Sequence, residues 1–365
     1  MILAHKIRLN PTSEQSDHFR KCCGIARFTW NWGLAEWDRQ YTAGGKPTIN
    51  DIKKQLNAIK REQFPWMLDA SKSVMEYALM NLGKAFANFF RGCKTGQAVG
   101  YPRFKSKRNP VQTFTLANDR VKVVGHTLAI QKCPGMVNMA EVLRFNGKLN
   151  AVTISTQAGR WYASIQVDVG DVEQAPQGSQ VGVDLGIKQL AVTSDGEVFE
   201  NQKALRSNLG KLAKRQRQLK RKQKGSNRWR KQMLRVSRLH ERVANIRKDA
   251  IHKLTTYLCK KYGHIAIEDL NISGMMKNRK LSRAIADCGW YEVRRQLEYK
   301  GELYGAVIDA ICRFYPSSKT HAACGYVKED LTLADRVWLC PKCNELVLRD
   351  ENAAANILSY SLSRD

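Results

Sequence analysis

Three cysteines and one histidine stand in two close pairs near the end of the chain. His321 and Cys324 form the first pair and Cys340 and Cys343 the second, with two residues between the members of each pair. Such spacing lets a tight turn, or knuckle, aim two side chains at one ion, and two knuckles give tetrahedral zinc. Because four protein ligands close the coordination sphere, the pattern predicts a structural zinc site rather than a catalytic one.

Three carboxylates have a local setting that suits a second metal centre. Asp184 ends an apolar stretch in GVDLGIK, Glu268 does so in HIAIEDL, and Asp350 directly precedes the helical pattern ENAAANIL. Phosphodiester cleavage requires hard cations, about 4 Å apart, that are held by oxygen ligands. Taken singly, each acid has a structural alternative, because Asp-x-Gly turns are common. Asp269, beside Glu268, is expected to point the opposite way if the strand pleat continues.

The elements that must position these residues follow from hydrophobic periodicity. In the second half of the chain, residues 180–200 predict three short strands with an Asp-Gly turn, and 264–268 predict a buried strand. Residues 203–248 predict two amphipathic helices that are broken at KGSN, residues 224–227. A further helix, a strand and a short C-terminal helix follow. Strand ends and a helix start can therefore converge on one edge of a mixed sheet.

The first half of the chain combines a β domain with helices. Residues 1–10 alternate like a strand, and residues 13–91 carry apolar side chains at helical spacing, for which the simplest interpretation is a buried core. From residue 112 to about residue 170, β-branched runs are separated by Gly, Asn and Asp turns. The first strand is assigned to this later β domain, which makes the helical part an insertion. Residues 171–180 are a polar linker that contains Pro and Gly.

The charge of the chain indicates a polyanionic partner. The 365 residues carry a formal net charge of +28, and eighteen Lys/Arg against one acid lie within 203–248. Such a face repels itself unless a phosphate backbone or an anionic membrane surface offsets it. No apolar run reaches the ~18 residues of a spanning helix, and the apolar start is too short for a signal peptide. We therefore expect a cytoplasmic or nucleoid-associated protein with reduced cysteines that binds nucleic acid.

Taken together, the motifs resemble one protein family. GVDLGIK, IAIEDL, the knuckles after YPSSKT, and RDENAAANIL resemble the TnpB family of transposon-encoded RNA-guided nucleases, which are relatives of type V CRISPR effectors. ARFTWN, ANFFR, YPRFKSK and the KGS turn are also similar to the family. The likeness covers nearly the whole chain.

The resemblance implies a multidomain α/β fold. Its parts would be a wedge β-barrel domain (1–10 and 106–172), a helical recognition domain (11–105), a RuvC nuclease domain of RNase H-like fold (173–316 and 348–365), and an inserted zinc ribbon (317–347).

The resemblance also implies a function. Such a protein binds a guide RNA transcribed from the transposon end and reads a short transposon-adjacent motif in duplex DNA. It then cuts DNA that matches the guide, so its partners are RNA and double- and single-stranded DNA, and a monomer is expected. The motif match assigns Mg²⁺ to Asp184, Glu268 and Asp350, and structural Zn²⁺ to the four knuckle ligands.

Motif reading is assigned to four positions that match the family. Lys72 and Glu76 are four residues apart on a helical pattern, and Phe114 and Thr115 begin the second β portion. Lys can contact phosphates or base acceptors and Thr can contact a thymine methyl group. An ordinary solvated helix face and a core Phe remain open as the alternative for these positions.

Two departures from the family pattern bear on function. His321 stands at the usual first-cysteine position, where imidazole preserves a zinc ligand. Leu348 stands where the family often has a further aspartate, two residues before Asp350. Two other readings are a nuclease-inactive RNA-guided repressor and a guide-independent zinc-ribbon DNA-binding accessory protein. The presence of all three carboxylates favours the nuclease.

Overall fold

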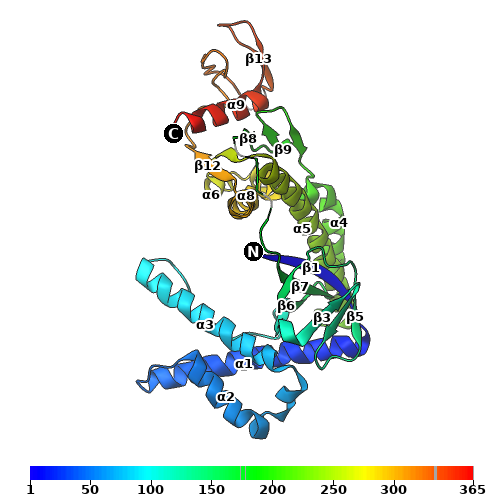
Figure 1. Ribbon diagram of the computed structural model, residues 1–365. Helices are drawn as coiled ribbons and strands as arrows, with labels where there is room; N and C mark the ends of the chain where they lie inside the picture. The colour runs from blue at the N-terminus through cyan, green and yellow to red at the C-terminus, as the bar shows by residue number, and fades with distance from the viewer. Residues whose placement is uncertain (173, 177, 333–334, 365) are drawn as a thin grey trace. The chain divides into compact units, whose positions relative to one another are not determined.

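The computed structural model describes residues 1–172, 174–176, 178–332 and 335–364. The chain divides into two compact units, Met1–Asp171 and Val172–Asp365 (Figure 1). Two positions of the predicted linker, 173 and 177, and two of the predicted zinc ribbon, 333 and 334, lie outside the described residues.

A seven-stranded antiparallel sheet and three long helices form the first unit. The strand order is β2-β6-β7-β1-β5-β4-β3, with β2 and β3 at its two ends. The helices follow β1 in the chain and precede β2. The elements are β1 (Ile2–Asn10), α1 (Ser13–Thr42), α2 (Ile49–Gln63), η1 (Pro65–Asp69), α3 (Lys72–Thr95), β2 (Gln112–Ala117), η2 (Asn118–Arg120), β3 (Val121–Val124), β4 (Thr127–Ile130), β5 (Met136–Met139), β6 (Lys148–Gln157) and β7 (Arg160–Asp168).

Helices and sheet of the first unit share one hydrophobic core. Ile7 and Leu9 are buried on alternate positions of β1, as the sequence pattern predicts. Phe19 of α1 packs against Phe114 of β2 and Trp161 of β7, with ring centroids 5.9 and 5.2 Å apart. Burying an aromatic ring of this kind contributes about 1.5–3 kcal/mol, so these contacts hold α1 on the sheet.

A five-stranded mixed sheet is the centre of the second unit. Its order is β10-β9-β8-β11-β12. Strands β8, β11 and β12 run parallel to one another, whereas β9 is antiparallel to both of its neighbours, β8 and β10. The elements are β8 (Gln180–Asp184), β9 (Gln189–Thr193), β10 (Val198–Glu200), α4 (Ala204–Lys220), α5 (Asn227–Lys261), β11 (His264–Glu268), α6 (Ile272–Met275), α7 (Ser282–Cys288), α8 (Trp290–Tyr304), β12 (Val307–Ile311), β13 (Val337–Leu339), β14 (Leu346–Leu348) and α9 (Arg349–Leu362).

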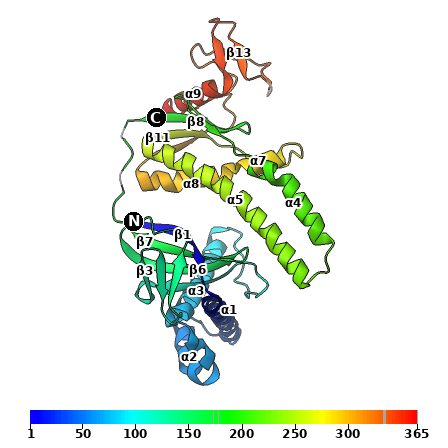
Figure 2. The ribbon, with the colours of Figure 1, turned by 90° about the vertical axis from the view of Figure 1, so that its right-hand side faces the viewer.

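Helices cover both faces of this sheet (Figure 2). Val183 and Ile267 point to one face and pack with residues of α5 and α8. Ala266 points to the other face and packs with Ile357 of α9. Strands buried on both faces read as continuous apolar runs, which is why GVD and IAIE are apolar up to their carboxylates.

Helix α9 lies very close to strand β8. A Cβ added at Gly182 would lie 2.0 Å from the carbonyl oxygen of Ala354 and 2.8 Å from the backbone nitrogen of Leu358. Real Cβ atoms do not tolerate such distances, so this strand position requires glycine. The close approach fixes the start of α9 relative to the end of β8.

The two basic helices predicted between 203 and 248 are α4 and α5. Their turn lies at KGSN, and Ser226 caps α5 by accepting a hydrogen bond from the backbone N–H of Trp229 at 3.1 Å. The helix α5 continues to Lys261, well beyond the predicted stretch. Among the described residues, none of the helices combines the length and apolar character needed to cross a membrane.

Candidate carboxylate and zinc sites

Asp184 and Glu268 end neighbouring parallel strands in register. Gly182 pairs with Ala266 and Val183 pairs with Ile267. Asp184 and Glu268 are therefore the residues that directly follow the last pair of the two strands. Side chains alternate along a strand, which puts Asp184 on the side of Gly182 and Glu268 on the side of Ala266. Because that side faces α9, both carboxylates lie on the α9 face of the sheet.

Asp350 lies in the first turn of α9. The Gly182–Ala354 contact holds this helix against β8, so its N-terminal turn faces the end of the strand. The structure thus brings together Asp184, Glu268 and Asp350, which are far apart in the sequence. An acid in the first turn is also favoured by the helix dipole.

Negative charge is crowded at this edge of the sheet. Burial raises the pKa of Asp184 to about 7, and the charges of Glu268 and Asp350 act in the same direction. Arg349 and Arg336 oppose the shift more weakly. A divalent cation would relieve this repulsion, and three carboxylates are the oxygen donors that Mg²⁺ takes. The chemistry of these three donors therefore suits such a cation.

Two of the three acids have protein partners. Arg336 donates from Nη1 to both oxygens of Asp350, at 3.0 and 3.2 Å. The hydroxyl of Ser317 donates to Oε1 of Glu268. Ser317 occupies only one of the two Glu268 oxygens, whereas Arg336 would share Asp350 with any bound cation.

Asp269 points away from this cluster, as the pleat predicts. Its two oxygens accept from Arg294 of α8 and from Arg313, which follows β12. These two ion pairs hold the pKa of Asp269 below its usual range. Asp269 therefore links the end of β11 to α8 and to the residues that follow β12. Glu268 is the acid that lies on the same face of the sheet as Asp184.

The two knuckles have the same backbone geometry. In the first, the N–H of Gly325 donates to the carbonyl of His321 at 2.9 Å, and in the second the N–H of Asn344 donates to that of Cys340 at 2.8 Å. Gly325 and Asn344 follow the second ligand of each knuckle at φ +72° and +61°. Gly and Asn are the residues that adopt this left-handed conformation most readily, so the local sequence dictates both turns.

The four knuckle side chains converge on one point. Their donor atoms all lie within 4.8 Å of one another. The Nδ1 atom of His321 is 3.1 Å from the sulfur of Cys324 and 3.3 Å from that of Cys343, and the sulfurs of Cys324 and Cys340 are 3.5 Å apart. The usual Zn–S and Zn–N bond lengths place neighbouring ligand atoms of a tetrahedral zinc site roughly 3.5–3.8 Å apart. An expansion of a few tenths of an ångström would accommodate the ion.

Neighbouring groups act on three of the four ligands, Cys340, Cys343 and His321. Burial disfavours the thiolate of Cys340, but hydrogen bonds from the backbone N–H groups of Cys343 and Lys342 lower its pKa. Burial and the nearby thiols Cys340 and Cys324 raise the pKa of Cys343, so Cys340 is the readier thiolate of the second knuckle. The Nε2 atom of His321 faces a carboxylate oxygen of Glu345 at 3.5 Å. A carboxylate on the outer nitrogen of a histidine orients the ring and makes it a better ligand. Nδ1 is therefore the nitrogen that would face a bound metal ion.

Leu348 lies immediately before α9. It pairs with Val337 at the end of the β13–β14 hairpin and is 47% exposed. It occupies the N-cap position of α9 and makes no side-chain cap hydrogen bond there. An aspartate at this place could cap the helix, so leucine removes a cap as well as an acid.

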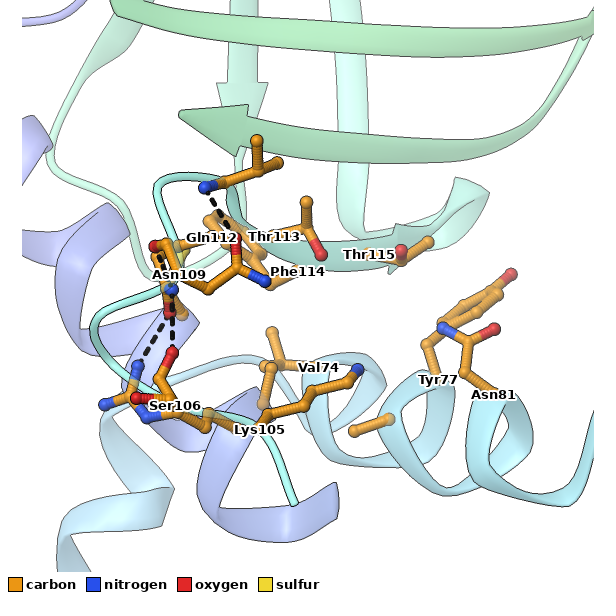
Figure 3. Close-up of a pocket in the computed structure, with 15 residues that line it drawn as sticks. Val74, Tyr77, Asn81, Lys105, Ser106, Asn109, Gln112, Thr113, Phe114 and Thr115 are labelled. Atoms are coloured by element: carbon orange, nitrogen blue, oxygen red, sulfur yellow. Dashed lines mark hydrogen bonds between the residues drawn. The ribbon is translucent and has the colours of Figure 1, made fainter. Parts of the chain in front are cut away.

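A pocket of about 260 Å³ lies in the first unit between α1, α3 and β2 (Figure 3). Residues of β2 line one side and residues of α3 the other. Gln112 is fixed there, because its side chain accepts from Arg27 at 2.8 Å and donates to the carbonyl of Asn109 at 2.7 Å. The polar residues that line it include Arg27, Tyr77, Asn81, Lys105, Ser106, Asn109, Gln112, Thr113 and Thr115.

The four positions matched to motif reading lie in two different pockets. Phe114 and Thr115 line the pocket of Figure 3, although Phe114 is also 2% exposed and part of the core. Lys72 and Glu76 line a separate pocket between α2 and α3, where Glu76 pairs with Lys53 at 3.1 Å. Tyr77 and Asn81 are the α3 residues that face Thr115. The two pairs are offset by five residues, which turns one pair about 140° around the helix axis from the other, and no local signal in the sequence fixes that phase.

Two compact units, each combining helices with a sheet, define a multidomain α/β protein. Three family models match it: a probable transposase family over residues 164–279, a helix-turn-helix domain over 1–46, and a Cas12f1-like TNB domain over 290–357. Residues 1–46 fold here as strand β1 followed by the continuous helix α1.

Known proteins resemble the chain over nearly its whole length. An Escherichia coli K12 protein named "Putative RNA-guided DNA endonuclease InsQ" is 34% identical over 98% of this chain and 91% of its own. A Streptomyces pristinaespiralis protein named "Putative RNA-guided DNA endonuclease" is 34% identical over 99% of this chain and 89% of its own. This chain belongs to the TnpB family.

A solved structure shares the fold. The Cas12f1 chain in a cryo-EM complex with sgRNA and target DNA superposes with a TM-score of 0.56 at 15% identity, over 95% of this chain and 83% of that one. At this identity the likeness concerns the fold alone.

Proposed function

We propose that this chain is an RNA-guided, Mg²⁺-dependent DNA endonuclease that cuts with Asp184, Glu268 and Asp350. One observation carries the proposal: Asp184 and Glu268 end adjacent parallel strands in register, on the face covered by the helix whose first turn bears Asp350. The names of the relatives, at 34% identity over almost the whole chain, support the activity.

The chemistry follows from what these residues can do. Two bound cations would activate water and stabilise the leaving oxygen of the phosphodiester. Asp184 and Glu268 would hold them from the sheet and Asp350 from the helix. The raised pKa of Asp184 keeps its carboxyl group partly protonated near neutral pH. Because a metal ligand must be deprotonated, this group would release its proton to solvent when a cation binds. Arg336 would share Asp350 with the bound cations.

The second unit is assigned the nuclease role. An antiparallel hairpin followed by parallel strands, with helices on both faces, supports an RNase H-like RuvC domain at 173–316 and 348–365. The knuckle geometry supports a zinc ribbon at 317–347, in which His321, Cys324, Cys340 and Cys343 hold structural Zn²⁺. Residues 1–10 and 106–172, whose strands form the seven-stranded sheet, would be the wedge domain, and 11–105 the recognition helices.

Nucleic acid is the proposed partner of the basic surface. The net charge of +28 and the run of Lys and Arg along α4 and α5 support binding of a guide RNA and of target DNA through phosphates. Base pairing with the guide would then supply most of the sequence specificity.

The pocket of Figure 3 is proposed to read the transposon-adjacent motif. Tyr77, Asn81 and Thr115 line it together with Lys105. Amide, hydroxyl and ammonium groups can bond to base edges, and a threonine methyl can contact thymine. Phe114 would act there as a core residue beneath the reading surface. In the neighbouring pocket, Lys72 would contact the nucleic-acid backbone, and Glu76 would stay paired with Lys53.

The test uses the protein with RNA expressed from its native locus. Purified ribonucleoprotein should cut a matched DNA duplex next to a short motif in the presence of Mg²⁺. Asp184→Ala should bind the same duplex with unchanged affinity and leave it intact. Tight occupancy by the wild-type complex without nicking in any divalent metal would instead indicate the repressor, and protein that carries no defined RNA would indicate the accessory protein.

A further inference from the structure

Three buried polar residues near the carboxylates take no part in the chemistry proposed above. Asn352 and Asn356 are one turn apart on α9 and are 8% and 3% exposed, and Ser317 is 5% exposed. A buried amide costs free energy unless it is hydrogen-bonded, so the partners of these side chains show what they do.

Both asparagines bind one short backbone segment, residues 317–322. Asn352 accepts from the N–H of Ala322 at 2.8 Å and donates to the carbonyl of Thr320 at 2.7 Å. Asn356 donates to the carbonyls of Ser317 at 2.7 Å and Thr320 at 2.5 Å. An asparagine amide carries its donor and its acceptor on two separate atoms, so Asn352 can bind an N–H and a carbonyl of the segment at once.

The same segment touches both candidate metal centres. At one end, the hydroxyl of Ser317 donates to Glu268. Near the other end, His321 presents Nδ1 to the sulfurs of the zinc cluster. The helix to which the segment is tied carries Asp350, two residues before Asn352. A ligand of the zinc cluster and two of the three carboxylates are thus joined through the six-residue segment 317–322, which is hydrogen-bonded at Ser317, Thr320 and Ala322.

We propose that Ser317, Asn352 and Asn356 are positioning residues through which the occupied zinc site sets the affinity of the carboxylate site for divalent cations. The idea rests on the proposed function, because it needs the carboxylates to bind cations. With zinc bound, His321 and hence segment 317–322 have one position, and Ser317 holds Glu268 in place for a cation. Without zinc, that end of the segment is released and Glu268 loses its fixed orientation.

Coupling of this kind is measurable without guide RNA or DNA. Mn²⁺ serves as a paramagnetic substitute for Mg²⁺. Its affinity for the full-length protein is measured by titration, from the loss of the electron paramagnetic resonance signal of free Mn²⁺. The zinc-free state is provided by Cys340→Ser, and zinc content is measured in every variant. We expect Cys340→Ser to weaken Mn²⁺ binding at least fivefold, the lower end of typical coupling between sites.

The deciding comparison is a double-mutant cycle. In a Ser317→Ala background, which removes one hydroxyl and should keep its zinc, Cys340→Ser should weaken Mn²⁺ binding by less than twofold. Asn356→Ala is a second background with the same expectation. Ser359→Ala, at an exposed position of α9, is the matched control and should leave the coupling at its wild-type size.

Two outcomes overturn the coupling. In one, Cys340→Ser has no effect on Mn²⁺ binding to the otherwise wild-type protein. In the other, the effect is equally large with and without the Ser317 hydroxyl. Asp184→Ala, measured in parallel, should abolish the tight Mn²⁺ site. If it does not, the carboxylate assignment of the proposed function fails and the coupling fails with it, so the two failures are distinguishable.

Discussion

Gly182 and Ala354 are so close that a single methyl group cannot fit between β8 and α9. The missing Cβ of Gly182 would lie 2.0 Å from the Ala354 carbonyl oxygen. Backbone atoms of a strand and a helix cannot move apart without moving the ends of both elements. Those ends carry Asp184 and Asp350, so the spacing of the two carboxylates depends on this glycine.

Gly182→Ala is therefore expected to lower the free energy of unfolding by about 1–3 kcal/mol and to reduce cleavage. Gly210→Ala is the matched control, because a Cβ at Gly210 of α4 meets nothing within 4 Å. There, alanine should stabilise by roughly 0.5–1 kcal/mol through its helix propensity. Urea denaturation measures both. Equal stability of the two variants would contradict the close approach.

The pH dependence of stability should reveal the buried carboxyl group of Asp184. Its pKa is raised to about 7, against about 3.9 in an unfolded chain. Between these values the folded state binds more protons than the unfolded state, so the contribution of this group falls as pH rises. Asp184→Asn cannot ionise. Its stability relative to wild type should increase by roughly 2–3 kcal/mol between pH 5 and pH 8.

That comparison needs magnesium-free buffer and a control for the lost charge. Asp249→Asn replaces an exposed carboxylate of α5 that pairs with Lys253 at 2.7 Å. Its stability difference from wild type should not follow the same pH course. Adding Mg²⁺ at pH 8 should raise the melting temperature of the wild type but not that of Asp184→Asn. A pH-independent difference for Asp184→Asn would show that this carboxyl group titrates normally.

Metal analysis tests the zinc cluster. Wild-type protein should carry about one zinc per chain, and Cys340→Ser should carry little, because a closed site needs four ligands. His321→Cys should keep its zinc, since a thiolate is an equally good ligand at that corner. Cys93→Ser, at an exposed cysteine of α3, should have no effect. Full zinc content in Cys340→Ser would remove the assignment.

A substitution at Leu348 is expected to stabilise the protein. As the N-cap of α9 it makes no cap hydrogen bond. Leu348→Asp should accept one from the first turn and stabilise the protein by about 0.5–1 kcal/mol. Leu346→Asp on the same hairpin, 70% exposed and outside the helix, controls for added charge. Thermal unfolding should separate the two, and an equal shift would mean that capping is not the cause.

Motif recognition should depend on one face of α3. Asn81→Ala is expected to weaken binding of the ribonucleoprotein to duplexes that carry the motif by about 1–3 kcal/mol, the range for a lost base contact. Glu76→Ala, on another face of α3 and in the other pocket, should change affinity little and equally for all sequences. Competition binding with a library of flanking sequences measures both. A relaxed motif in Glu76→Ala alone would reverse the assignment.

Local sequence predicted the main elements and defined the candidate ligand sets. Alternating apolar residues predicted β1. Because successive side chains of a strand point to opposite faces, the sequence also predicted that Glu268 and Asp269 point in opposite directions. The knuckle spacing, with Gly325 and Asn344 after the second ligands, dictated both turns. These properties depend on neighbours within a few residues, where backbone sterics and side-chain periodicity act directly.

Only the tertiary structure decided which distant residues meet. It placed Tyr77 and Asn81 opposite Thr115, while Lys72 and Glu76 lie in another pocket. It also joined Asn352 to the segment that carries His321. Helix phase and packing distance arise from contacts between segments far apart in the chain, such as the approach of Ala354 to Gly182, and periodicity within one segment does not encode them.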